Sequence, residues 1–224
     1  MNIEFFFNYM LQNKSEVIKQ ALRGELPSAI VKTLIGVSLL SFAVFGFMIG
    51  SSHSILQGVV SFIKLPILFY ITGIICFPTL YIFLSLFGLQ VSFKGLSHFC
   101  VIAISIMSLI LIAFAPVSLF FLVVGTHYEV FKMLNVAMMA VAGFSGVYIF
   151  KQYILSNAPE DFSSESRTRA SFFIKVWLLM FALIGANLGF AMSPIFGNPT
   201  VEFILFTEAD QNFFSHILSI LFNR

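Results

Sequence analysis

Long apolar runs separated by short polar segments dominate the chain, and their lengths predict membrane-spanning helices. A bilayer core of about 30 Å needs roughly 20 apolar residues, because each residue adds about 1.5 Å to a helix. Five runs reach this length, and none has a charged residue near its middle. We expect the spans at residues 31–50, 65–87, 99–124, 133–154 and 172–193.

A short amphipathic helix is predicted before the first span, at residues 14–24. Ser15 is a candidate N-cap, and Gly24 is a candidate residue just beyond the helix end. Apolar residues fall on one face and basic residues on the other, which is typical of a helix on a membrane surface. A solvated leader helix is the alternative. The apolar face consists of Val17, Ile18, Ala21 and Leu22.

The segment after the last apolar run predicts turns followed by a surface helix. Pro194, Gly197 and Pro199 stop the preceding helix and favour turns. Residues 211–222 place apolar side chains on one face, as an interfacial helix does. Six Phe residues lie in this tail, and exposing each to water costs roughly 1.5–3 kcal/mol. We therefore expect an outer cap that binds a partner through Phe206, Phe213, Phe214, Ile217 and Leu221.

These elements predict an all-α fold: a polytopic membrane bundle of five transmembrane helices with an N-terminal amphipathic helix and a C-terminal interfacial helix. The expected parts are a cytoplasmic amphipathic segment at 1–30, the transmembrane domain at 31–193 and an outer-side tail at 194–224. The polar loop at 155–171 is too short to be a separate domain.

Composition supports this assignment and excludes other classes of protein. Hydrophobic residues make up 59% of the 224 residues and charged residues only 10%, against about 45–50% and about 25% in soluble domains. These values exclude a soluble enzyme, a disordered chain and a coiled coil. The net charge of +2 is too small for a nucleic-acid-binding protein. Cys76 and Cys100 lie in apolar runs and predict neither a disulfide framework nor a metal site.

The distribution of Lys and Arg predicts the orientation of the chain. Cytoplasmic loops of membrane proteins carry an excess of these residues. The N-terminal segment and the connections after the second and fourth spans hold nine of them with their flanks, and the other side holds three. With five spans, this bias places the N-terminus in the cytoplasm and the C-terminus outside.

Pairs of small residues at i, i+4 spacing predict close helix packing, because they let helix backbones approach each other in lipid. The fourth and fifth spans are expected to pack together through such pairs. An Asn in the fifth span is expected to form an interhelical hydrogen bond. Contacts between copies of the chain or with other subunits are the alternative. The helix-packing residues are Gly46 and Gly50, Ala142 and Gly146, Gly185 and Gly189, and Asn187.

No pattern in the chain predicts catalysis. It contains no phosphate loop, G-x-S-x-G or paired-carboxylate motif. The histidines and carboxylates lack the spacing of a metal site, so we expect no metal and no cofactor. No ionisable residue lies deep in a span, which argues against a self-sufficient ion-driven transporter. Pro66, Pro78 and Pro116 are expected to kink the second and third spans.

Five spans after a short charged segment resemble the Yip family of Rab-interacting membrane proteins and their bacterial relatives, over residues 26–153. The family's acidic-Leu-Tyr-Gly-Pro signature is missing, so Rab binding is not implied. The chain also resembles uncharacterised bacterial membrane proteins with a tail like residues 194–199 and an Asn212-Phe213-Phe214-type helix. Some of these carry an actin-binding WASP-homology label, but the chain has no basic Leu-Lys-Lys motif. The resemblance implies a bacterial inner-membrane protein without catalytic residues.

The function expected from the sequence is that of a non-catalytic scaffold or accessory subunit of a membrane assembly. Its partners would be the lipid bilayer and other membrane-protein subunits. The alternative is the permease subunit of a transporter powered by a separate ATPase. That alternative requires a cytoplasmic coupling helix, for which residues 89–98 are the candidate, with Lys94 as their single charge. A membrane enzyme acting on lipids is the third expectation.

Overall fold

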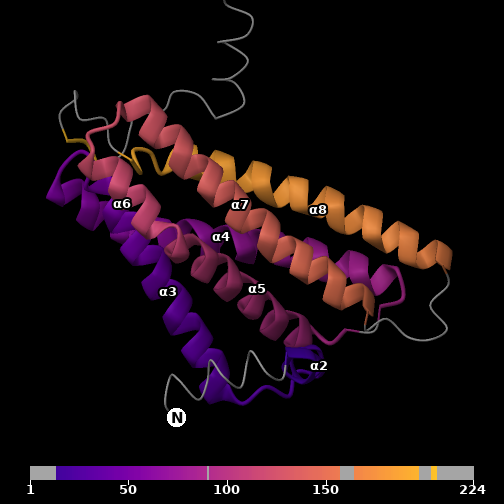
Figure 1. Cartoon of the computed structure of the whole chain (residues 1–224). Helices are drawn as coiled ribbons and strands as arrows, with labels where there is room; N and C mark the ends of the chain where they lie inside the picture. The colour runs from indigo at the N-terminus through magenta and orange to yellow at the C-terminus, as the bar shows by residue number, and fades with distance from the viewer. Residues whose placement is uncertain (1–13, 90, 157–163, 197–202, 206–224) are drawn as a thin grey trace, which may run out of the picture.

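The structure is a computed structural model that describes residues 14–89, 91–156, 164–196 and 203–205. Within these ranges the chain forms helices and no strand (Figure 1). The helices are α2 (Lys14–Arg23), α3 (Ser28–Gly50), α4 (Ile55–Leu86), α5 (Phe93–Ala113), α6 (Ala115–Val123), α7 (Tyr128–Ser156) and α8 (Ser164–Ala191).

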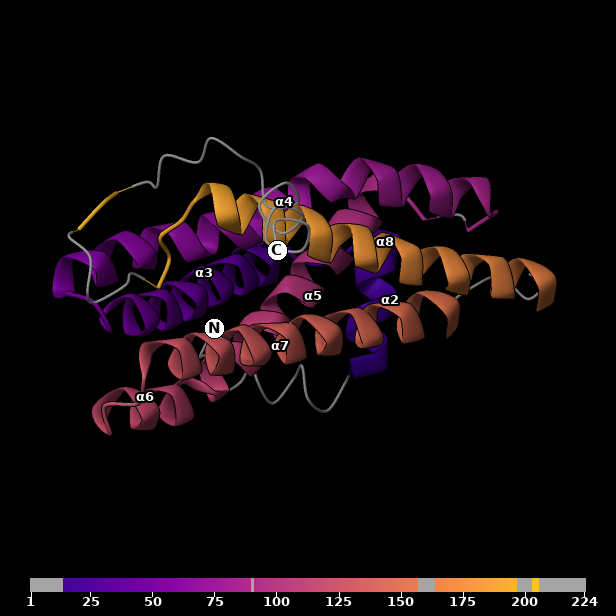
Figure 2. The ribbon, with the colours of Figure 1, turned by 90° about the horizontal axis from the view of Figure 1, so that it is seen from above.

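The long helices form a ring. Helix α3 packs along α4 and α5, α4 packs along α8, and α5 packs along α7. A smaller contact between α7 and α8 closes the ring (Figure 2). Although α4 and α5 both pack on α3, they touch each other over only a short stretch. This gap matters for the cavity described below.

Within the part of the chain that the structure describes, four helical segments are long and apolar enough to cross a membrane, which supports an all-α membrane protein. Large apolar side chains such as Leu40 and Ile74 are exposed on their outer faces. Helix α7 is not one of the four, so the fourth expected span, at 133–154, stays a prediction. The four segments are Ser28–Gly50, Ile55–Leu86, Phe93–Val123 and Ser164–Ala191.

The predicted N-terminal helix is present as α2, but its apolar face is covered by protein. Val17 and Ala21 are buried in a cluster with residues of α3 and α5. The contact with α5 is so close that a Cβ on Gly95 would lie 1.9 Å from the carbonyl oxygen of Leu22. Helix α2 ends at Arg23, and Gly24 follows it with a φ of +75°. Helix α2 is therefore part of the bundle's packing.

Glycines bring α3 and α4 together, as the i, i+4 spacing predicted for the first span. A Cβ on Gly46 would lie 2.3 Å from the backbone oxygen of Ser61. One on Gly50 would lie 2.6 Å from the backbone oxygen of Gln57. Backbone atoms cannot move aside as a flexible side chain can, so only glycine fits at both positions. This approach sets α3 directly against the first half of α4.

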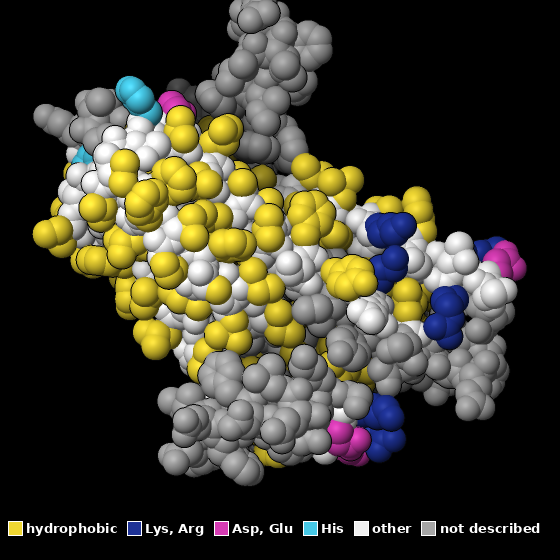
Figure 3. Space-filling model, viewed as in Figure 1, with side chains coloured by type: hydrophobic (Ala, Val, Ile, Leu, Met, Phe, Trp, Pro, Cys, Tyr) yellow, Lys and Arg dark blue, Asp and Glu magenta, His cyan; other side chains and the backbone are white. Residues whose placement is uncertain are grey.

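The two ends of the bundle differ in charge. Lys and Arg side chains gather at the end where α2 and α5 meet and where α8 begins (Figure 3). We name this the basic end; its exposed cations include Lys19, Arg23, Lys94, Arg167 and Arg169. The opposite end holds the turn between α3 and α4 and the segment after α8, and we name it the tail end.

Helix α6 continues from α5 after a break at Phe114, so the third expected span consists of two helices. Pro116 lies in the first turn of α6, where a missing backbone N–H is tolerated. The hydroxyl of Ser118 donates to Oδ1 of Asn135 on α7 over 2.6 Å. Both side chains are buried, so this hydrogen bond joins α6 to α7.

Candidate functional site

Three polar side chains lie buried on one face of α4, near the tail end. Gln57, Ser61 and Lys64 follow one another at i, i+4 and i+7, so they share a helix face. Gln57 is 1% exposed, and Lys64 is 4% exposed. Ser54 caps the helix, because its hydroxyl accepts the backbone N–H of Gln57 at 3.1 Å. Helix α4 thus begins at Ile55, whereas the sequence predicts that the second span begins at Leu65. The helix therefore includes all three residues.

These three side chains hold the backbone of the segment that follows α8. Lys64 Nζ donates to the carbonyl oxygen of Met192 at 2.8 Å and to that of Leu205. Gln57 Nε2 donates to the carbonyl oxygen of Pro194 at 2.7 Å. The hydroxyl of Ser61 donates to the carbonyl oxygen of Ile195. We name this set the polar clasp: Gln57, Ser61 and Lys64 with the carbonyls of Met192, Pro194, Ile195 and Leu205.

The clasp exists because the chain leaves its helix inside a packed region. Helix α8 ends at Ala191, so the carbonyls that follow have no intrahelical donors. An unbonded backbone group away from water costs several kcal/mol in a membrane environment. Side-chain donors of α4 replace the missing ones. Ser52 adds a further bond, since its hydroxyl donates to the carbonyl oxygen of Phe196 at 3.0 Å.

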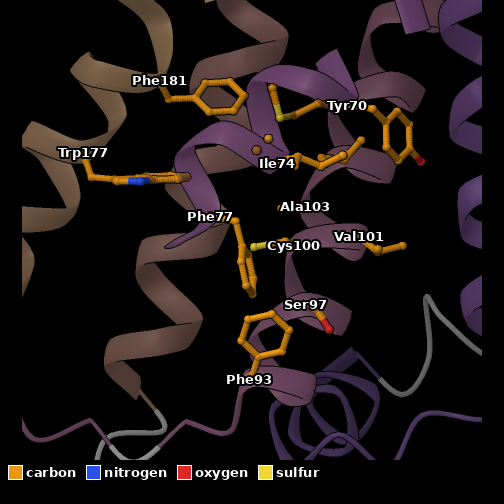
Figure 4. Close-up of a pocket in the computed structure, with 14 residues that line it drawn as sticks. Tyr70, Ile74, Phe77, Phe93, Ser97, Cys100, Val101, Ala103, Trp177 and Phe181 are labelled. Carbon is orange, nitrogen blue, oxygen red and sulfur yellow. The ribbon is translucent and has the colours of Figure 1, made fainter. Parts of the chain in front are cut away.

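A second feature is an apolar cavity of about 350 Å³ in the gap between α4 and α5. Helix α8 supplies Trp177 and Phe181 to its wall (Figure 4). Helix α7 supplies Gly146. We name it the α4–α5 cavity. From α4 its lining residues are Tyr70, Gly73, Ile74 and Phe77, and from α5 they are Phe93, Ser97, Cys100, Val101, Ala103, Ile104 and Met107.

The side-chain hydroxyl and N–H groups in this lining are bonded to protein. The hydroxyls of Tyr70 and Ser38 lie 2.5 Å apart and join α4 to α3. Trp177 Nε1 donates to the carbonyl oxygen of Cys76 at 3.0 Å. The hydroxyl of Ser97 donates to the carbonyl oxygen of Lys94 at 2.8 Å. The cavity therefore presents apolar surface to whatever enters it.

The expected pairing of small residues on α7 and α8 is wrong. Ala142 and Gly146 face α5 instead: a Cβ on Gly146 would lie 2.2 Å from Cγ of Met107, and Ala142 is buried in a cluster with Met107. Gly185 and Gly189 face α4, where their nearest atoms belong to Thr72 and Leu68 at 3.5 Å and 3.8 Å. The spacing identified interface positions, but the partner helices differ because local spacing carries no information on which helix lies opposite.

The predictions for Asn187 and for the residues of the tail are not tested by the structure. Asn187 lies half-buried on α8, and its expected interhelical hydrogen bond stays a prediction. The partner-binding residues Phe206, Phe213, Phe214, Ile217 and Leu221 lie outside the described residues. In the described ranges, no group of three His, Cys, Asp or Glu residues is placed to hold a metal ion.

Sequence reasoning missed the polar clasp. Lys64 precedes the apolar run at 65–87, and it is one of the three cations that the sequence places on the outer side. The signal was the recurrence of Gln57, Ser61 and Lys64 on one helical face, against apolar residues on the others. Comparisons of the chain with family models, curated proteins and solved structures found no match, so the site's chemistry must come from the residues themselves.

Proposed function

We propose that this chain is a non-catalytic integral membrane protein that acts as a scaffold or accessory subunit of a larger membrane assembly. The observation that carries the proposal is the polar clasp. Burying a lysine within an apolar helix is costly unless its charge is compensated. Here the compensation comes partly from backbone carbonyls after α8, so the cost of burial is tied to one placement of the tail.

If the tail presents a docking surface, its first residues must be held in one position relative to the bundle. The clasp bonds carbonyls at Met192, Pro194 and Ile195, and it reaches Leu205 as well. The described residues 203–205 are exposed. We propose that the following apolar residues, from Phe206 to Leu221, contact the partner. Another membrane-protein subunit is the expected partner, and a second copy of this chain would serve the same role.

The proposed setting is a bacterial inner membrane with five spans, the N-terminus in the cytoplasm and the tail outside. The gathering of cations at the basic end supports this orientation. Alkaline-phosphatase fusions after Arg224 should be active, and fusions within residues 163–166 should be inactive. The reverse pattern would overturn the orientation.

Co-purification from native membranes tests the assembly role. The tagged wild type is compared with a chain lacking residues 207–224 and with Lys64→Met, which keeps the side chain's length but removes its donors. Lys132→Met is the matched control, because Lys132 is an exposed lysine on α7. Gel filtration in mild detergent checks that each variant remains folded.

We expect the truncated chain and Lys64→Met to lose partner subunits that the wild type and Lys132→Met retain. Quantitative mass spectrometry of the purified samples measures this difference. Wild-type protein that purifies without stoichiometric partners would contradict the scaffold role. Full retention of partners by the truncated chain would show that the tail is not the docking surface.

The second candidate is the permease subunit of a transporter powered by a separate ATPase. The α4–α5 cavity favours it, because a path for an apolar substrate needs an interior site. The expected coupling helix is less favourable, since residues 93–98 form the first turns of α5 rather than a separate element. Recovery of an ATPase with the wild-type chain would support this second function over the first.

A further inference from the structure

We propose that the α4–α5 cavity is a binding site for one acyl chain of a membrane phospholipid. This inference concerns a different part of the molecule from the polar clasp and does not depend on the scaffold role. It rests on the chemistry of the lining, the position of the opening and the direction in which the cavity runs.

The lining selects an apolar occupant. The hydroxyl of Tyr70 and the indole N–H of Trp177 are bonded to α3 and to α4. A polar ligand would give up its bonds to water and find few replacements, which is unfavourable. A hydrocarbon chain has no hydrogen bonds to give up on entry, and it supplies the dispersion contacts that the lining of an empty void lacks. The cavity volume of about 350 Å³ falls in the size range of ligand sites, roughly 300–1,000 Å³.

The cavity opens on a surface that faces lipid. At its rim, Ile74 is 68% exposed and Phe93 is 60% exposed. At its inner wall, Trp177 is 7% exposed and Met107 is 4% exposed. Both rim residues belong to segments apolar enough to span the membrane. The molecules that meet this opening are therefore phospholipid chains rather than water.

The cavity also runs in the direction of a lipid chain. Its α5 wall extends from Phe93 to Met107, and fourteen steps of about 1.5 Å give roughly 21 Å along the helix. One leaflet contributes about half of a 30 Å hydrocarbon core. Phe93 is the first residue of α5 and lies at the basic end. A chain from the leaflet at the basic end would thus enter at Phe93 and reach towards Met107 past the bilayer centre.

Charges at the basic end suit the headgroup of such a lipid. Lys94 follows Phe93 directly and is exposed. Arg23 is also exposed and adjoins Gly24, which lies against the Lys94 side chain. Glu25 is the acidic neighbour in this group. A phosphate in the interface would lie beside these cations while one of its chains occupies the cavity.

The chain carries its own reporter for the test. Trp177 is the single tryptophan, and it lines the cavity's inner wall. The purified protein is reconstituted into phosphatidylglycerol vesicles whose acyl chains carry bromine, which quenches tryptophan fluorescence on close approach. Two variants fill the cavity from opposite walls, Ala103→Phe and Gly73→Leu. Leu40→Phe is the control, because Leu40 is exposed on α3 and does not line the cavity.

We expect bromine quenching of Trp177 in the wild type and in Leu40→Phe, and at least a twofold smaller effect in the two filled variants. Native mass spectrometry of detergent-purified wild type should show one retained phospholipid, which the filled variants lose. Circular dichroism confirms folding, and either filled variant suffices if the other fails to fold. Equal quenching in all four proteins, or wild type that retains no phospholipid, would overturn the proposal.

Discussion

The two halves of α4 use the same helical spacing for opposite purposes. In the first half, Gln57, Ser61 and Lys64 fill one face and bond to the backbone after α8. In the second half, Tyr70, Ile74 and Phe77 form one wall of the α4–α5 cavity. The first face meets a chain segment that needs donors, whereas the second meets a gap. The difference shows that the neighbour across a helix face, and not the spacing along the helix, decides whether that face forms a packed contact or lines a cavity.

The largest effect should come from adding a methyl group where α3 meets the first half of α4. Gly46→Ala would place Cβ 2.3 Å from the Ser61 backbone oxygen. Overpacking of this kind costs about 1–3 kcal/mol and sometimes more, and we expect the upper part of that range. Unfolding in detergent and SDS measures it. Gly36→Ala is the control on the same helix, since nothing lies within 4 Å of its Cβ position. Equal stability of the two variants would refute the tight contact.

Removing the central donor of the polar clasp should have the next largest effect. Lys64→Met leaves carbonyls at Met192 and Leu205 without this donor. Losing a buried partner costs about 1–3 kcal/mol. Exposed Lys132→Met should stay within about 0.5 kcal/mol of the wild type. The same unfolding assay applies, and an unchanged Lys64→Met protein would mean that the clasp does not stabilise the fold.

The boundary between the two halves of α4 can be tested at Tyr70. Tyr70→Phe removes the bond to Ser38 and with it one connection between α3 and α4. The expected loss is about 0.5–1.5 kcal/mol. Tyr148→Phe is the control, because Tyr148 is an exposed tyrosine of α7. Destabilisation of the same size in both variants would show that the hydrogen bond between Tyr70 and Ser38 does not stabilise the fold.

The smallest effect is expected opposite the cavity half of α4, at the glycines of α8. A Cβ on Gly185 or Gly189 would lie at ordinary contact distance from Thr72 or Leu68. Replacing glycine by alanine within a helix is favourable by up to about 1 kcal/mol. Gly185→Ala and Gly189→Ala should therefore be neutral or slightly more stable in the unfolding assay. A loss of stability of more than about 1 kcal/mol would show instead that these glycines lie in a close contact, as their spacing predicts.

Much of the fold was predictable because each signal is local. Gly24 marked the end of α2, and long apolar runs marked the helices that are apolar enough to span a membrane. Helix pairing was not predictable, because Gly185 and Gly146 look alike in sequence although one faces α4 and the other α5. The cavity was hidden for a related reason: Tyr70 and Phe77 show the spacing of ordinary core residues. Whether such a face is filled depends on the angle between helices.

The clasp was hidden for a different reason. A lysine at the edge of an apolar run normally lies in water, and the sequence predicts the same for Lys64. Its burial depends on the carbonyls of Met192 and Leu205, which are far away in sequence. Spacing within α4 was the only local sign. A pattern of polar residues on one face of an apolar helix therefore warrants a search for backbone that lacks donors.

The length of α4 has a consequence for the membrane around it. At about 1.5 Å per residue, its 32 residues extend for roughly 48 Å, against a hydrocarbon thickness of about 30 Å. Both ends carry exposed apolar side chains, Ile55 at one and Leu86 at the other. Even a tilt of about 40°, the upper end of the usual range, leaves a vertical extent of roughly 37 Å. This hydrophobic mismatch should make the protein more stable in thick bilayers than in thin ones, so that lipid chain length becomes a determinant of its fold.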